Sequence, residues 1–181
     1  MIELKFSCVP TEGIRDIIGT ENEFLFEFLE DWIEDNKNFY SYKDVAAKLL
    51  LATDEINYDV ACAAMVIQED ATEPELTVSL IKTNPRYENM GVATEMYNLM
   101  HSYSGGFKSV RNMVFEQNVE SRGFHEKMGY ELHPLYKTRW TKTLDAGEQV
   151  GVFDDINNTQ PKTFSPGERW WQSADAEKEN H

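Results

Sequence analysis

The sequence predicts an α/β (α+β) fold in which helices flank a mixed, mostly antiparallel central sheet. Three strand-like segments follow one another over residues 48–83 with short polar connections between them, which is typical of an antiparallel meander. The last of these, residues 76–83, runs through a proline corner into an amphipathic helix that opens at Gly91. A chain of 181 residues with 41% hydrophobic content can bury one core around such a sheet.

The first part of the chain is predicted to form one strand and two helices. Residues 2–9 alternate enough between apolar and other side chains to predict a strand. A short helix is predicted at 14–18 and a longer one at 21–36. The longer helix carries an apolar stripe formed by Leu25, Phe28, Leu29 and Trp32. Much of the remaining helix surface is acidic, which predicts a solvated face.

The meander begins in a segment that the sequence leaves ambiguous. Residues 45–52 suit either a helix or a strand, and we place a strand at about 48–53. A turn at 54–57 then leads to a second strand over 58–68. The polar connection 69–74 leads in turn to the strand that precedes the proline corner.

Downstream of the long helix, the sequence predicts further strands and one more helix. Residues 104–106 end the long helix with two glycines, and 107–115 form the next strand. A short helix over 122–128 is closed by Gly129. Residues 130–143 are predicted to supply one or two final strands.

The character of the chain changes at Leu144. From there on, Gly, Pro and Asn are scattered without sustained periodicity. We therefore predict a domain over residues 1–143 and an extended acidic C-terminal tail over 144–181. The tail contains the pair Trp170-Trp171, which is expected to clip onto its own domain, with a partner protein or a homodimer interface as the alternative.

The net charge of −15 argues against a protein that binds nucleic acid through a basic surface. It favours cationic partners such as a cationic amine substrate, a polyamine or a basic protein. Acidity also serves solubility alone, so it is weak evidence for a substrate. An unrelated alternative is a carboxylate surface that imitates DNA phosphates and occupies a DNA-binding protein.

The two cysteines and the hydropathy of the chain predict where the protein works. Cys8 and Cys62 lie in apolar strand-like runs and are expected to be small buried hydrophobes, and no residues near them have the spacing of a metal site. No segment approaches about 18 uninterrupted apolar residues, and the N-terminus lacks a basic region followed by an apolar stretch. We expect a soluble cytoplasmic protein that does not bind a membrane.

The passage from residue 76 to residue 93 predicts an anion site. A strand that delivers small residues to a helix start leaves backbone amides pointing outward, with the positive end of the helix dipole behind them. Residues 84–90 make the turn, and Gly91 opens the helix. A second block follows about 25 residues on, at 118–130, after another strand-like run.

Together the two blocks resemble the GCN5-related N-acetyltransferase (GNAT) superfamily. Its usual pattern is a strand, a proline, an aromatic-Arg-Gly-x-Gly-x-Gly/Ala loop and a helix, followed by a strand, Asn-x-x-Ala and an aromatic-Tyr-x-x-x-Gly-aromatic end. The matching positions here are Pro85, Tyr87, Gly91 and Ala93, then Asn118, Ser121, Phe124, Gly129 and Tyr130. The order and spacing of both blocks agree, so the resemblance implies a GNAT fold over about residues 1–143.

The resemblance also implies acetyl-CoA as co-substrate. Its pyrophosphate would lie on the backbone amides of Asn89, Met90, Gly91, Val92 and Ala93. Its pantetheine arm would follow the strand that ends at Thr83, whose backbone would orient the acetyl group. Asn118 matches the asparagine on the pantetheine side, and capping of the following helix is an equally compatible role.

Two residues depart from the family pattern. Glu88 stands where the loop commonly has Arg or Gln, and its carboxylate would repel a phosphate. His125 stands where the family often has a tyrosine that protonates the CoA thiolate. As a general acid, His125 would work best below neutrality, because an imidazole with a pKa of about 6.5 is mostly neutral at pH 7. The alternative is a partly exposed helix residue. For the base we expect Glu116, acting through a water, with a plain surface charge as the alternative.

The function that this resemblance implies is acetyl-CoA-dependent N-acetylation of a primary amine on a small molecule or protein. In the superfamily, the region between the first two strands commonly shapes the acceptor pocket, so carboxylates of the acidic helix would attract the amine. The alternative is a catalytically weakened GNAT-like scaffold that acts as a binding, inhibitory or structural protein through its acidic surface or its tail.

Overall fold

The computed structural model describes residues 1–10, 22–36, 47–69 and 74–165. Within these ranges the elements are, in chain order, β1 (Ile2–Pro10), α2 (Glu23–Asn36), β2 (Ala47–Asp54), β3 (Asp59–Glu69), β4 (Glu75–Thr83), the 3₁₀ helix η1 (Pro85–Tyr87), α3 (Val92–Ser102), β5 (Ser109–Met113), α4 (Val119–Lys127), β6 (Glu131–Leu132), β7 (Arg139–Thr143), the 3₁₀ helix η2 (Phe153–Asn158) and β8 (Lys162–Phe164). The predicted short helix at 14–18 lies outside the described residues.

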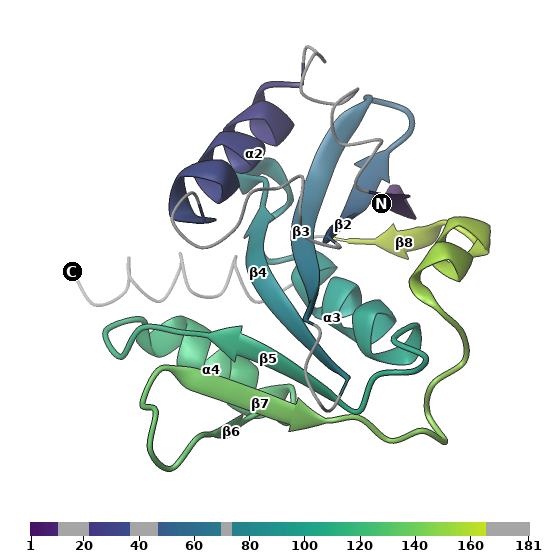
Figure 1. Ribbon diagram of the computed structural model, residues 1–181. Helices are drawn as coiled ribbons and strands as arrows, with labels where there is room; N and C mark the ends of the chain where they lie inside the picture. Colours follow the sequence, from purple (N-terminus) through teal and green to yellow (C-terminus); the bar gives the residue numbers. More distant parts are fainter. Residues whose placement is uncertain (11–21, 37–46, 70–73, 166–181) are drawn as a thin grey trace, which may run out of the picture.

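The strands of the described residues form one eight-stranded sheet in the order β6-β7-β5-β4-β3-β2-β1-β8 (Figure 1). The pair β4–β5 is parallel, and the other six neighbouring pairs are antiparallel. This confirms the predicted mixed, mostly antiparallel sheet. The crossover between the parallel strands is made by α3, as parallel strands require a connection long enough to return along the sheet.

Within the ambiguous segment, residues 47–52 belong to the strand β2, whose two faces are both buried under packed side chains. Leu49 and Leu51 pack toward α2, whereas Leu50 packs into the core on the opposite side. A strand buried on both faces needs a continuous apolar run rather than strict alternation. That requirement explains why periodicity alone did not distinguish a strand from a helix here.

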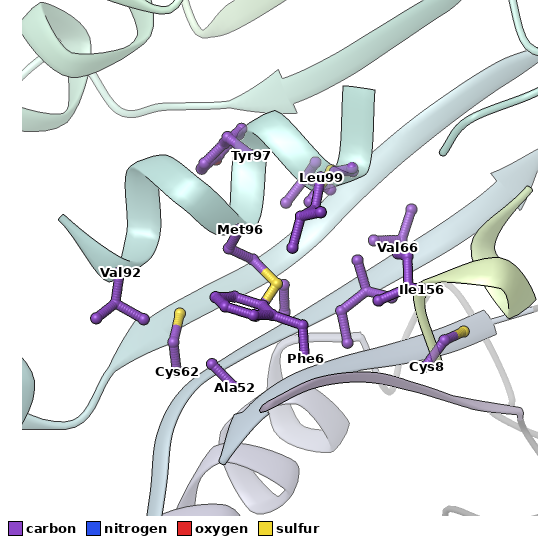
Figure 2. Close-up of a cluster of buried hydrophobic side chains, with 14 of the residues drawn as sticks. Phe6, Cys8, Ala52, Cys62, Val66, Val92, Met96, Tyr97, Leu99 and Ile156 are labelled. Carbon is purple, nitrogen blue, oxygen red and sulfur yellow. The ribbon is translucent and has the colours of Figure 1, made fainter. Parts of the chain in front are cut away.

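The sheet separates the core into two layers, with α2 on one face and α3 on the other. The stripe of α2 residues packs on β2 and β3, as its spacing predicted. On the other face, Met96 and Val92 of α3 lie over side chains of β1 to β3, including Phe6 and Cys62 (Figure 2). Cys8 and Cys62 are free and buried, in accord with the expectation of small buried hydrophobes.

The sheet opens between its two parallel strands. β4 pairs with β5 only from Glu75 to Val78, opposite Ser109 to Asn112. Beyond Val78, β4 stays with β3 as far as Thr83, while β5 continues with β7 (Figure 1). A register shift between β3 and β4 lies at this point and adds local twist. The result is a wedge that opens toward the C-terminal end of β4.

Residues 144–165, the described part of the predicted extended tail, contain a 3₁₀ helix and a strand. They run along one side of the molecule to form η2 and the edge strand β8, which pairs with β1 (Figure 1). Phe153 and Ile156 are 3% and 1% exposed and belong to the main core. The Asn157 side chain accepts from the Cys8 amide at 2.9 Å and donates to the Cys8 carbonyl at 3.2 Å. The sequence did not predict this packing, because the apolar residues of the segment are isolated and follow no helix or strand period. The pair Trp170-Trp171 lies outside the described residues.

The helices of the described part are short. The longest, α2, has 14 residues. None is long and apolar enough to cross a membrane.

Candidate functional site

A cleft of about 700 Å³ occupies the place where β4 and β5 part, between the N-terminus of α3 and the first turns of α4. Its walls include seven of the nine residues that the sequence predicts for the site: Thr83, Asn89, Gly91, Val92, Ala93, Asn118 and His125. Met90 belongs to the same loop, but its side chain packs against the core. Glu116 follows β5 on an exposed stretch and does not line the cleft.

The loop before α3 lines this cleft through Asn89 and Gly91. Asn89 and Gly91 both have left-handed backbone conformations, with φ of 61° and 83°. Successive amides beside such residues can turn toward one side and form a concave anion site. Gly91 is the N-cap of α3 and makes no side-chain capping bond. A Cβ built on Gly91 would meet no heavy atom within 4 Å, so the cradle is open.

The loop is tied to the β2–β3 turn by a buried hydrogen bond. Tyr87 is 4% exposed, and its hydroxyl donates to Asp54 at 3.1 Å. Burial would raise the pKa of Asp54, but hydrogen bonds from Asn57, Ile56 and Tyr87 together lower it. Burial, followed by the neighbouring Asp54 carboxylate, raises the pKa of Tyr87 to about 12, so the phenol remains a donor. This link holds the loop in place, and sequence reasoning missed it because its partners are 33 residues apart.

His125 lies on the cleft-facing helix α4, but it is only 3% exposed, unlike the partly exposed residue considered from sequence. Its Nδ1 lies 2.7 Å from the carbonyl oxygen of Ser121. Because a carbonyl only accepts, Nδ1 carries the ring proton. Nε2 then accepts from the side-chain amide of Asn112 at 2.7 Å and from the Tyr97 hydroxyl at 3.0 Å.

This arrangement does not fit the general acid that the resemblance implies for His125. Burial lowers the pKa of His125, and the bond to the Ser121 carbonyl offsets this only in part. The ring is therefore neutral at pH 7, and its single proton points into α4 rather than toward the cleft. Asn112 and Tyr97 were missed at the sequence level. The available signal was a polar Asn112 between Val110 and Val114, at the middle of three alternating positions that face inward.

Asn118 has the capping role expected from sequence. Its side chain accepts from the Ser121 amide at 3.1 Å and so caps α4. It also lines the cleft, opposite the start of α3. The capping interpretation is confirmed, and the contact with pantetheine stays a prediction.

The charges around the cleft are unusual for an anion site. No Lys or Arg belongs to its walls in the described part of the chain, whereas Glu88 and Glu120 do. The favourable groups for a phosphate are therefore amides and the dipole of α3, not cationic side chains. In the same ranges, no cluster of three His, Cys, Asp or Glu residues is placed to hold a metal ion.

No protein-family model matches the chain, and no curated protein sequence matches it. Solved structures do match in three dimensions. A GNAT-family acetyltransferase from Listeria monocytogenes superposes with a TM-score of 0.54 at 10% identity, over 79% of this chain and 96% of the other. A mutant of the spermidine N-acetyltransferase SpeG from Vibrio cholerae gives 0.51 at 14% identity, over 77% and 93%.

A chain of the NatB acetyltransferase complex bound to CoA also superposes with a TM-score of 0.51 at 14% identity, over 77% of this chain and 99% of the other. At such low identities the likeness establishes the fold and leaves activity open. On the strength of these superpositions, the chain has the fold of the GNAT acetyltransferases.

Proposed function

We propose that the protein is an acetyl-CoA-dependent N-acetyltransferase that acts on a primary amine of a small molecule or protein. The observation that supports this most is the open amide cradle at Gly91, beside the point where β4 and β5 part. Such a cradle suits a diphosphate, and the wedge offers space for an extended arm that leads away from it.

In this proposal the chain contributes mainly backbone groups to cofactor binding. The amides of residues 89–93 would hold the pyrophosphate, with the α3 dipole behind them. The pantetheine arm would lie along the cleft side of β4 up to Thr83, whose opposite neighbour is Cys62 of β3. Asn118 would meet the arm from the α4 side.

Acetyl-CoA would supply an activated thioester, and the amine nitrogen would form a bond to its carbonyl carbon as the carbon–sulfur bond breaks. Glu116 remains the predicted base and would act through a water, since it does not line the cleft. The proton for the departing thiolate would come from solvent, because Nε2 of His125 accepts hydrogen bonds and has no proton to donate.

The acceptor is proposed to be cationic. A second cleft of about 620 Å³ lies on the α2 side and includes Glu23, Glu27 and Asp59 in its walls. It borders Asn84, directly after Thr83, so the two clefts flank the C-terminal end of β4. The carboxylates there, like the net charge of −15, would attract an ammonium group before it loses its proton.

Calorimetric titration with acetyl-CoA tests the proposal. We expect wild-type protein to bind at about micromolar Kd. Gly91→Trp should abolish binding by filling the cradle. The matched control is Gly106→Trp, because Gly106 also has a positive φ of 94° and open space around its Cβ position but lies outside the cleft walls. Absence of wild-type binding at about millimolar ligand would overturn the proposed function.

The alternative function, a GNAT-like scaffold with weakened catalysis, is favoured by one observation: the neutral, inward-facing His125. It predicts acetyl-CoA binding without turnover. Incubation with acetyl-CoA and polyamines or lysine-containing peptides, followed by mass spectrometry, separates the two functions. Acetylated product supports the enzyme, and binding without product supports the scaffold.

A further inference from the structure

Three buried polar side chains from three different elements meet beside the cleft, and two of them, Tyr97 and His125, belong to its walls. The side-chain amide of Asn112 (β5) donates to the Tyr97 hydroxyl (α3) at 2.7 Å and to Nε2 of His125 (α4) at 2.7 Å. The Tyr97 hydroxyl and His125 Nε2 are 3.0 Å apart. All three residues are at most 8% exposed. Because the three side chains bond to one another, they form a closed triangle.

The triangle sits where the wedge begins. Asn112 is the last β5 residue that pairs with β4, opposite Val78. Tyr97 lies on the helix whose N-terminus carries the Gly91 cradle, and His125 lies one turn after Ser121 on the opposite wall. A displacement at the triangle would therefore move both walls of the cleft relative to each other.

Both ring nitrogens of His125 make hydrogen bonds that fix the position of the ring. Nδ1 donates to the Ser121 carbonyl, which ties the ring to its own helix, and Nε2 accepts from β5 and α3. The aromatic rings of Phe124 and Tyr130 pack on it edge-on, with centroids 5.6 and 5.2 Å away. The groups that face the imidazole from α3, α4 and β5, and from Tyr130, are thus neutral. Removing the ring leaves one N–H of the buried Asn112 amide without its partner, which is costly.

We propose that His125 is a positioning residue that sets the separation of α3 and α4, and thereby the affinity of the cleft for acetyl-CoA. This inference rests on the proposed function, but it assigns His125 a role that differs from proton donation. The residue acts through Asn112 and Tyr97 and does not need to touch the cofactor.

Two variants at one position distinguish positioning from acid catalysis. Gln can place a side-chain oxygen near Nε2 and accept from Asn112, but it cannot act as a general acid. We expect His125→Ala to raise the Kd for acetyl-CoA by about tenfold to a hundredfold. We expect His125→Gln to recover most of the affinity and of kcat, with an unchanged kcat profile between about pH 6 and 9. Unchanged affinity in His125→Ala, with kcat lost equally in both variants, would establish the general acid and overturn the inference.

A measurement on wild-type protein covers the case in which His125→Ala does not fold. Nitrogen-15 NMR of the histidine rings should show His125 as the neutral tautomer with the proton on Nδ1, without titration near its ordinary pKa of about 6.5. A proton on Nε2, or titration near that value, would contradict the inference. The two failures are distinguishable: no acetyl-CoA binding by wild-type protein overturns the proposed function, whereas wild-type binding with the wrong tautomer overturns the positioning role alone.

Discussion

Replacing Glu88 by Gln should tighten acetyl-CoA binding, and the gain should be greatest at low ionic strength. Glu88 is exposed, lines the cleft and directly precedes the first residue of the amide cradle, Asn89. In the described part of the chain, no Lys or Arg of the cleft wall offsets its charge. Its carboxylate therefore opposes the binding of a phosphate that the amides favour.

The size of the effect follows from Coulomb's law and screening. A carboxylate about 7 Å from a phosphate costs about 2 kcal/mol at an effective dielectric constant of about 20. At about 0.15 M salt the Debye length is about 8 Å, which reduces the cost to about 1 kcal/mol. That is about a fivefold change in Kd, and it should grow to about twentyfold at about 0.01 M salt, where screening is weak.

The assay is calorimetric titration of acetyl-CoA at the two salt concentrations. Glu148→Gln is the matched control, because Glu148 is an exposed carboxylate beyond the far end of α3, about 16 Å of helix away from the cradle. Wild-type affinity should rise with salt, since the cleft wall is acidic and the whole chain carries −15. If added salt weakens wild-type binding and Glu88→Gln has no effect, cationic side chains hold the phosphates and the amide-cradle argument is refuted.

Three further outcomes test other parts of the structure. Phe153→Ala should lower the free energy of unfolding in urea by about 3–5 kcal/mol, because Phe153 is 3% exposed in the core, whereas exposed Val152→Ala should change it by less than about 0.5 kcal/mol. Burial, with a smaller effect from Lys142, lowers the pKa of His101 to about 4. The free energy of unfolding therefore holds its full value above the unfolded pKa of about 6.5 and falls by up to about 3 kcal/mol as the pH drops toward 4. His101→Gln should reduce this dependence of the free energy of unfolding on pH, measured by urea unfolding. An unchanged dependence would contradict the assignment. Tyr87→Phe removes a hydrogen-bond donor from the buried carboxylate of Asp54 and should lower the free energy of unfolding by about 1–3 kcal/mol, measured by thermal unfolding. It should also weaken acetyl-CoA binding. If stability and affinity are both unchanged, the loop does not depend on this bond.

Local sequence preferences determine much of the fold without reference to tertiary contacts. The apolar stripe of α2, the strand before the proline corner and the opening of α3 at Gly91 follow from periodicity and backbone preferences, which act over a few residues. Gly91 is needed because its φ of 83° is strained for other residues. The two sequence blocks also placed most cleft residues, since each block is a contiguous strand-to-helix connection.

The sequence by itself determined most of the elements as far as β7, their order, and the turn at Gly91 that opens α3. Only the tertiary structure decided which groups His125 contacts, how Tyr87 holds the loop, and that residues 153–164 complete the core and the edge of the sheet. The physical reason is the same in each case. The side of a ring that carries its proton, and the surface that buries an isolated apolar residue, depend on groups that are distant along the chain and meet only when the elements pack.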